Sequence, residues 1–162
     1  INYCILRYFN IAGSSPSGKI GLINKSDHLF KNFSREIVKK RPILKIYGNN
    51  YNTKDGSCIR DFIHVSDIAE IHYKVLEKIN KLNNSKTLNC GYNKGISVLE
   101  VAKTFKKQTS KKVEIFVSKR RKGDLVKIIA SNSKLKNFIK WKPKFNNLNT
   151  IVKSCISWEK RQ

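Results

Sequence analysis

The sequence has no methionine, only three prolines and no long apolar run. A segment that crosses a membrane needs ~20 consecutive apolar residues, and no stretch approaches that length. The first residues, INYCILRYFNIAG, lack the basic start and the small-residue cleavage site of a signal peptide. Because translation starts at methionine, we expect the chain to be a piece of a longer protein. Its 162 residues suffice for one domain with a real core.

Acidic residues are also scarce, with 11 Asp and Glu against 34 Lys and Arg and a formal net charge of +23. Such a charge is typical of proteins that bind nucleic acid or anionic membrane surfaces. Here the lysines are scattered from Lys19 to Lys160 and form no block. Lys, Asn and Ile, which all have AT-rich codons, are abundant together. We therefore interpret the charge as a solvated lysine-rich surface, and keep a basic nucleic-acid-binding module as an alternative.

The four cysteines include no C-x-x-C pair. Cys4, Cys90 and Cys155 have apolar neighbours, which is typical of small buried side chains. This usage predicts a reduced, cytoplasmic compartment.

Arginine is rare, with seven against 27 lysines. Arginine in such a chain can mark a place where a planar, two-pronged cation is required. Arg60 and the pair Arg120 and Arg121 therefore stand out.

Apolar periodicity predicts strands that alternate with helices, which indicates an α/β fold. A capping box at Ser97–Glu100 predicts one helix start, and Ser66 is the expected N-cap of another. The predicted strands are 2–13, 43–48, 58–65, 86–92 and 113–118; the predicted helices are 29–38, 66–81, 98–105, 133–139 and 149–160.

Several motifs of cofactor-binding proteins are absent from the sequence. It contains no G-x-x-G-x-x-G or G-x-G-x-x-G, no P-loop and no Tyr-x-x-x-Lys pair. Residues 1–162 therefore lack a complete dinucleotide-binding fingerprint.

The stretch DGSCIRDFIHVSDIAEIH, residues 55–72, concentrates acids, histidines and an arginine. His64 and His72 do not have a recognised metal-ligand spacing, and we interpret His72 as a half-buried, satisfied side chain. On a strand, Asp61 and His64 would point to opposite faces, which disfavours acid–base chemistry between them. Asp61 is expected to accept backbone N–H groups or to pair with a cation, which leaves anion binding by Arg60 as the favoured interpretation.

A second arginine lies on the loop RRKGD, residues 120–124. Arg60 and Arg121 converging on a diphosphate would match its charge and its geometry, at about 1.5–3 kcal/mol for each charge-assisted bond. Asp124 would then be free to accept a hydrogen bond from a ribose. From composition alone, this remains one hypothesis among several.

A family resemblance adds to this reading. The segments LRYFNIAGSSPSGKIG, LKIYGNNYNTKDGSCIRDFIHVSDIAEIH, LNCGYNKGISVLEV and RRKGDL, together with a closing W-x-P…WE pattern, follow one another in order. The chain resembles the C-terminal half of the UDP-glucose 4-epimerases, which belong to the extended short-chain dehydrogenase/reductase superfamily. The resemblance implies that 1–162 is a single C-terminal segment, in which the last Rossmann strands and helices interleave with a small α/β substrate-binding region. It places the NAD-binding part before Ile1.

The resemblance also implies a role for individual residues. It assigns Phe9 to the nicotinamide end of NAD through its backbone, and Asn10 and His28 to the neighbourhood of the phosphates. A set of three, Lys45, Ile46 and Tyr47, would line the uracil.

In the same way, Arg60 and Arg121 would clamp the diphosphate, Asp124 would hold the ribose and Ile128 would limit the size of the hexose. The chain departs from the family at Lys31, where proline is usual.

The activity implied by the resemblance is the interconversion of UDP-glucose and UDP-galactose through an NAD-dependent 4-keto intermediate. The chain would supply the half that binds the UDP-sugar, and it is expected to be inactive alone because the catalytic Tyr and Lys would lie before Ile1. A homodimer is a further expectation, and neither a specific nucleic acid nor a membrane is expected as a partner. The alternatives are another nucleotide-sugar epimerase or decarboxylase of the same superfamily, and the basic nucleic-acid-binding module.

Overall fold

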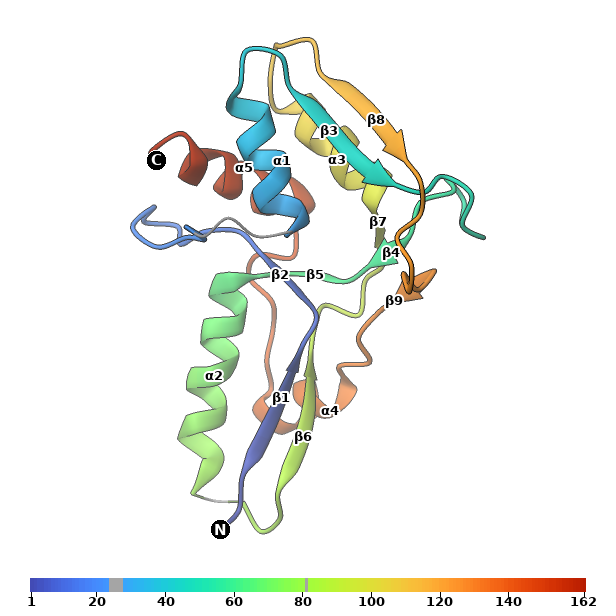
Figure 1. Ribbon diagram of the computed structural model, residues 1–162. Coiled ribbons are helices and arrows are strands. Elements are labelled where there is room, and N and C mark those ends of the chain that lie inside the picture. Colours follow the sequence, from blue (N-terminus) through green and yellow to red (C-terminus); the bar gives the residue numbers. More distant parts are fainter. Residues whose placement is uncertain (24–27, 81) are drawn as a thin grey trace.

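The computed structural model describes residues 1–23, 28–80 and 82–162. It confirms the α/β class, with short strands and helices alternating along the chain (Figure 1). The helices are α1 (Leu29–Val38), α2 (Val65–Ile79), α3 (Val98–Lys107), α4 (Ser133–Ile139) and α5 (Leu148–Glu159). The strands are β1 (Cys4–Tyr8), β2 (Asn10–Ala12), β3 (Ile43–Tyr47), β4 (Ile59–Arg60), β5 (Phe62–His64), β6 (Lys86–Cys90), β7 (Ile96–Ser97), β8 (Glu114–Ser118) and β9 (Lys127–Ile128).

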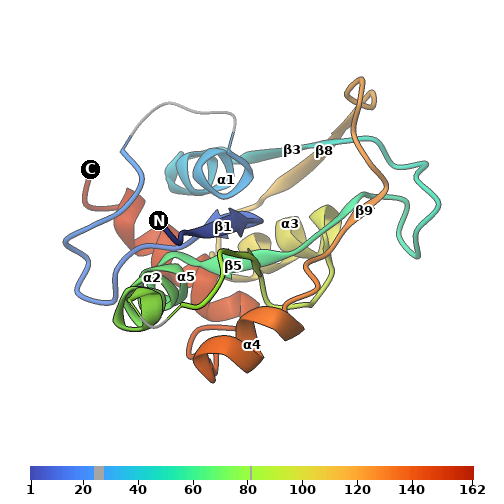
Figure 2. The ribbon, with the colours of Figure 1, turned by 90° about the horizontal axis from the view of Figure 1, so that it is seen from below.

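The strands pair mainly in parallel. β1 pairs with β6, β2 with β5 and β3 with β8, all in parallel, while β4 lies between antiparallel β7 and parallel β9. In Figure 1, β1 and β6 form one end of the molecule beside α2 and α4, and β3, β8, α1, α3 and α5 form the other. Seen from below, α2 and α4 lie on the same side of β1 (Figure 2). The short pair β2–β5 joins the two ends.

The helices form because their apolar residues recur at helical spacing. Buried Phe30, Phe33 and Ile37 make the inner face of α1, and α2 and α3 bury similar stripes. Phe30 and Phe33 meet Phe105 of α3 with ring centroids 5.6 and 5.5 Å apart, and Phe30 also meets Phe62 of β5 at 5.0 Å. A fully buried side chain of this size contributes about 1.5–3 kcal/mol. This aromatic cluster fixes α1, α3 and β5 against one another.

Three predicted elements differ in detail. The expected strand 2–13 is divided into β1 and β2. The expected strand 58–65 is divided into β4 and β5, because Asp61 between them turns its carboxylate toward other backbone groups. The expected N-cap Ser66 is wrong: α2 begins at Val65, and the Nδ1 atom of His64 accepts the Ser66 N–H at 3.1 Å. The capping box at Ser97 is confirmed, since its side chain accepts the Glu100 N–H.

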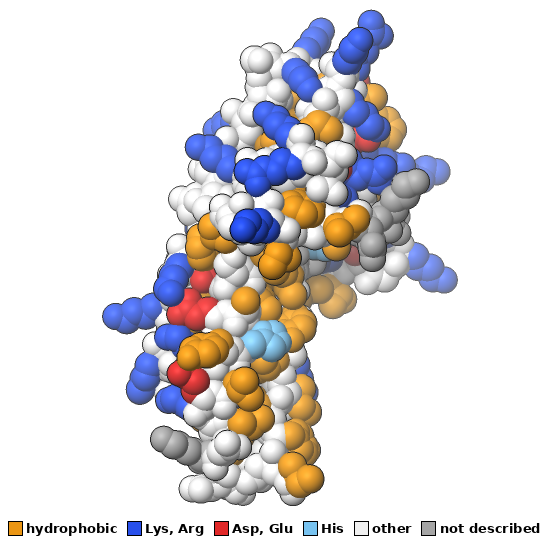
Figure 3. Space-filling model, turned by 90° about the vertical axis from the view of Figure 1, so that its left-hand side faces the viewer, with side chains coloured by type: hydrophobic (Ala, Val, Ile, Leu, Met, Phe, Trp, Pro, Cys, Tyr) orange, Lys and Arg blue, Asp and Glu red, His pale blue; other side chains and the backbone are white. Residues whose placement is uncertain are grey.

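The surface differs between the two ends of the molecule. Figure 3 shows Lys and Arg side chains over much of the upper part of one face, and hydrophobic side chains along its lower part. Large apolar residues exposed on β1, α2 and the segment before β1 are Ile1, Tyr3, Ile5, Tyr8, Tyr73 and Leu76. None of the helices in the described residues is long and apolar enough to span a membrane.

Candidate functional site

A cavity of about 480 Å³ opens between the start of α1, the end of β3 and the loop that joins β8 to β9. Eight of the ten residues to which the family resemblance assigns a role line it. They are Asn10, His28, Lys45, Ile46, Tyr47, Arg60, Arg121 and Asp124. These residues come from segments that are far apart in the sequence, and the fold brings them to one place.

Arg60 lies at the end of β4 and is only 9% exposed. Its Nη1 atom donates to the carbonyl oxygens of Leu125, at 2.7 Å, and of Ile59, at 2.9 Å. Its Nη2 atom lies 3.4 Å from Oδ1 of Asp124. These contacts hold the guanidinium in one orientation at the wall of the cavity, which is the preorganisation that anion binding requires.

Arg121 lies over the ring of Tyr47, with its guanidinium carbon 4.0 Å from the ring centroid. The ammonium of Lys45 lies 5.1 Å from the same centroid. The hydrogen bond from Arg121 is the main cause that lowers the pKa of the Tyr47 hydroxyl. The end of β3 therefore presents an aromatic ring with two cations close to it, a surface suited to a flat, polar ring system.

The start of α1 forms the opposite wall. His28 is its N-cap, and Leu29 and Asn32 also line the cavity. The first turn contains no acidic side chain, so the partial positive charge of the helix start faces the cavity uncompensated by a carboxylate from that turn. Burial lowers the pKa of His28, with a smaller opposing effect from a hydrogen bond to the Ile11 backbone. His28 is thus neutral at pH 7.

Sequence reasoning missed six residues of the cavity. Four of them, Leu29, Phe33, Phe62 and Val98, carry the hydrophobic pattern of their elements, which signals burial but not proximity to a site. The other two are Asn32 and Cys58. No sequence pattern marks Asn32 as a binding residue, while Cys58 lies inside the stretch 55–72. Burial raises the pKa of the Cys58 thiol, so the thiol stays protonated.

Phe9 and Ile128 do not line this cavity. Phe9 lies in a neighbouring, mostly apolar cavity of about 570 Å³, which shares Asn10 and His28 with the first. Ile128 pairs with Arg60 in the sheet and lies outside the linings of both cavities.

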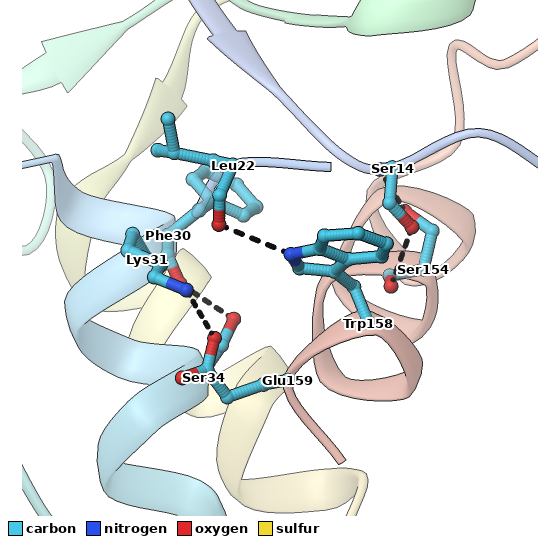
Figure 4. A network of polar contacts seen from close by, with 8 residues as sticks. All are labelled: Ser14, Leu22, Phe30, Lys31, Ser34, Ser154, Trp158 and Glu159. Atoms are coloured by element: carbon cyan, nitrogen blue, oxygen red, sulfur yellow. Dashed lines mark hydrogen bonds and ion pairs between the residues drawn. The ribbon is translucent and has the colours of Figure 1, made fainter. Parts of the chain in front are cut away.

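The neighbouring cavity contains a buried ion pair. Nζ of Lys31 lies 2.7 Å from Oε2 of Glu159, and the two side chains are 6% and 10% exposed (Figure 4). In the same view the indole of Trp158 donates to the Leu22 carbonyl at 3.0 Å. α1 begins at Leu29 as predicted, and the unusual Lys31 joins α1 to α5 through this ion pair.

The remaining polar residues of the stretch 55–72 have structural partners. Asp61 is fully buried, and its carboxylate accepts the backbone N–H groups of Tyr92, Asn93 and Ala130 at 2.9, 2.9 and 3.2 Å, as predicted. His72 is exposed rather than half-buried; it bonds the Ile68 carbonyl at 2.8 Å and the Tyr8 hydroxyl at 2.5 Å. Across residues 1–23, 28–80 and 82–162, no group of three or more His, Cys, Asp or Glu is placed to hold a metal ion.

Comparison with known proteins defines the class. Residues 1–91 match the model of the NAD dependent epimerase/dehydratase family, and the chain belongs to that family. It is 40% identical over 157 residues to the UDP-glucose 4-epimerase of Azospirillum brasilense, covering 96% of this chain and 45% of the relative. It is 38% identical over 161 residues to that of Halalkalibacterium halodurans, covering 99% and 48%. The chain spans about half the length of these curated relatives.

Solved structures agree with the sequence relatives. The UDP-glucose-4-epimerase from Stenotrophomonas maltophila with bound NAD and formylated UDP-arabinopyranose superimposes with a TM-score of 0.93 at 29% identity, covering 99% of this chain and 48% of that structure. The UDP-glucose 4-epimerase from Bifidobacterium longum in complex with NAD+ and UDP gives 0.89 at 29% identity, over 99% and 48%. The fold is therefore that of the corresponding half of NAD-bound epimerases.

Proposed function

We propose that the 480 Å³ cavity binds the UDP part of a UDP-sugar, and that the whole protein interconverts UDP-glucose and UDP-galactose with NAD. The observation that carries the proposal is the convergence of Arg60, Arg121 and Asp124 with an aromatic–cationic strand end in one cavity. The two relatives described above, both UDP-glucose 4-epimerases, support it.

The cavity offers a place to each part of the nucleotide. Uracil would lie against the end of β3, where Tyr47 supplies a ring face and Lys45 and Ile46 the flanking backbone. The diphosphate would take the guanidinium groups of Arg60 and Arg121, beside the positive end of α1.

The ribose and the sugar would lie on either side of the phosphates. Asp124, held 3.4 Å from Arg60, has a second carboxylate oxygen for a ribose hydroxyl. Asn10 and His28 line both cavities, so a sugar attached to the diphosphate would pass them toward the side of Phe9. For Ile128, the role of limiting the sugar remains a proposal and has no support from the cavity linings.

In this proposal the chain grips the nucleotide and leaves the hexose free to turn. NAD, when bound, supplies reversible hydride acceptance at C4 of the hexose. The nicotinamide side would be met by the Phe9 backbone, in the mostly apolar cavity. We further propose that residues 1–162 act as one C-terminal segment, since the sequence itself has no Tyr-x-x-x-Lys pair to move the hydroxyl proton.

The decisive experiment uses a chimera. The 45% of the Azospirillum brasilense relative that this chain matches is replaced by residues 1–162, and the product is assayed with UDP-galactose and NAD. Formation of UDP-glucose supports the proposal. Inactivity on UDP-galactose, together with decarboxylation of UDP-glucuronate or epimerisation of a UDP-pentose in parallel assays, would favour another enzyme of the superfamily. The unaltered relative serves as the positive control, and the chimera with Arg60→Ala as the matched negative control.

Titration of the 162-residue chain with UDP tests the binding half of the proposal alone. A nucleic-acid-binding module would instead bind DNA tightly, with a steep salt dependence, and would ignore UDP. Loss of UDP binding in Arg60→Ala with DNA retention unchanged supports the nucleotide-sugar site. Equal loss of both would favour the basic module.

Assembly and location are further parts of the proposal. The exposed apolar residues of β1 and α2 support contact with another polypeptide surface, and a homodimer is one such contact. Sedimentation of the active chimera would measure its mass. Four free cysteines support a reducing, cytoplasmic compartment, which a fluorescent fusion would test.

A further inference from the structure

Two consecutive arginines stack on two tyrosines, and one of the two pairs lines the 480 Å³ cavity proposed for UDP, called the UDP cavity below. Arg121 lies over Tyr47 at 4.0 Å, and Arg120 lies over Tyr51 with its guanidinium carbon 3.9 Å from the ring centroid. Arg120 also donates from Nη2 to the Asn50 carbonyl. The sequence singles out Arg120 by the rarity of arginine, but the nucleotide site proposed above does not use it, since Arg120 does not line that cavity.

Tyr51 is a fixed platform for Arg120. The residue is 5% exposed, and its backbone N–H donates to the Gly56 carbonyl at 2.8 Å. Gly48 makes room for the stack: a Cβ there would lie 2.5 Å from Cε2 of Tyr51 and 2.7 Å from Cγ of Arg120. The φ of Gly48, +79°, also disfavours a side chain. The missing side chain of Gly48 and its backbone conformation therefore both leave space for the stack of Arg120 on Tyr51.

The loop held by this stack carries two of the proposed ligands. It runs from 119 to 126, between β8 and β9, and includes Arg121 and Asp124. At its far end, Leu125 accepts a hydrogen bond from Arg60 and Val126 accepts one from the Ile59 N–H at 2.9 Å. Between these anchors Arg121 is exposed, and a Cβ on Gly123 would meet nothing within 4 Å. At the β8 end, Arg120 on the buried Tyr51 is therefore a side-chain anchor of the loop, beside the stack of the exposed Arg121 on Tyr47.

We propose that Arg120 is a positioning residue for UDP binding: its stack on Tyr51 fixes the loop so that Arg121 and Asp124 face the nucleotide. This inference rests on the proposed UDP site. Arg120 itself lines a separate hollow with Asn49 and Asn50 and is not in the lining of the UDP cavity. Arg120 therefore affects UDP binding through the position of the loop.

The test measures UDP and uridine binding to the 162-residue chain by calorimetry, for Arg120→Ala, Arg120→Lys and Lys122→Ala. Loss of a cation–π stack and a charge-assisted bond is expected to raise the Kd for UDP about five- to thirty-fold in Arg120→Ala. Uridine binding should weaken less than UDP binding, because the strand end that would take uracil is intact and only the ribose contact with Asp124 depends on the loop. Lys122→Ala removes an equal charge from the same loop, and its Kd for UDP should stay within about two-fold of the unaltered chain.

A double-mutant cycle separates positioning from general charge or folding effects. If Arg120 acts through Arg121, the double change to alanine should weaken UDP binding little more than Arg121→Ala alone. Arg120→Lys keeps the charge but loses the planar stack, so its Kd should fall between those of the unaltered chain and Arg120→Ala. Additive effects, or equal losses in Arg120→Ala and Lys122→Ala, would overturn the positioning role.

The outcomes also separate this inference from the proposed function. An unaltered chain that binds UDP, with Arg120→Ala binding equally well, overturns the positioning role and leaves the proposed site standing. An unaltered, folded chain that binds neither UDP nor uridine overturns the proposed site and the positioning role together. Circular dichroism of each variant shows whether a loss of binding reflects a loss of fold, and Arg120→Lys then decides the question.

Discussion

Lys31 of α1 and Glu159 of α5 form an ion pair 2.7 Å long, with both side chains at most 10% exposed. The pair faces the mostly apolar cavity beside the proposed UDP site. Removing one partner leaves a buried, uncompensated charge, which costs more than the pair itself contributes. The ion pair therefore joins the two helices, and substitution of either partner alone should lower the stability of the fold.

We expect Lys31→Met to lower the free energy of unfolding by about 3–5 kcal/mol, because Glu159 is left buried without a cation. The double variant Lys31→Met with Glu159→Leu should recover most of that loss. Urea unfolding measures both. Lys39→Met, which breaks an exposed pair with Glu36, is the control and should cost less than about 1 kcal/mol. The prediction would be contradicted if Lys31→Met lowered the free energy of unfolding as little as Lys39→Met does.

Arg60→Lys should weaken UDP binding by about ten-fold or more, although the charge is kept. The lysine ammonium cannot hold Leu125 and Asp124 and also present a planar fork to a diphosphate. Arg41→Lys, at an exposed position outside the cavity, is the matched control and should bind UDP as the unaltered chain does. Calorimetry with UDP would refute the idea if both variants bound alike.

Stability should fall as the pH drops from about 7 to 5. Burial lowers the pKa of His64 from its ordinary 6.5, and of His28 in the same direction. The unfolded chain then binds more protons than the native chain below pH 6.5, so stability is fully present above that pH and is lost toward the lower native pKa. Protonation also removes the Nδ1 acceptor that caps α2.

The variant His64→Asn tests the origin of this pH dependence. Asparagine keeps an acceptor for the N-cap but does not titrate, so the fall in unfolding free energy between pH 7 and 5 should be smaller. His28→Asn, added to it, should reduce the remaining fall in unfolding free energy. Chemical unfolding at each pH provides the measurement, and an unchanged slope in the double variant would assign the effect to other groups.

The chain alone should not epimerise UDP-galactose when NAD is added. Its sequence contains no Tyr-x-x-x-Lys pair, and the cavity proposed for UDP holds no tyrosine and lysine at that spacing. Turnover assayed by formation of UDP-glucose should stay at background, while the chimera with the Azospirillum brasilense relative is active. Turnover by residues 1–162 alone would contradict this division of roles.

Local sequence patterns were sufficient to predict most of the helices and strands. The helices Leu29–Val38 and Ser133–Ile139 have the predicted bounds, because strong apolar periodicity and clear flanking residues define them. The two-residue strands β7 and β9 were not predicted, since two residues carry no period. The capping role of His64 was also missed, because Ser66 has the more usual cap side chain.

The site depended on a different kind of information. Rarity of arginine pointed to Arg60 and Arg121, but their convergence depends on the pairing of β4 with β9, which no local pattern specifies. The family resemblance supplied most of the eight residues that meet in the cavity. Neither the rarity of arginine nor the family resemblance predicted the stack of Arg120 on Tyr51, because the stack depends on the space left by Gly48.

Asn10 and His28 stand between two cavities of different character. Both are uncharged at neutral pH, since burial lowers the pKa of His28. The cationic groups Lys45, Arg60 and Arg121 line one cavity, and in the other the charge of Lys31 is balanced by Glu159. Within the proposed function, this partition sorts a ligand by charge: the anionic portion is retained at the arginines, and only a neutral group gains by passing onward.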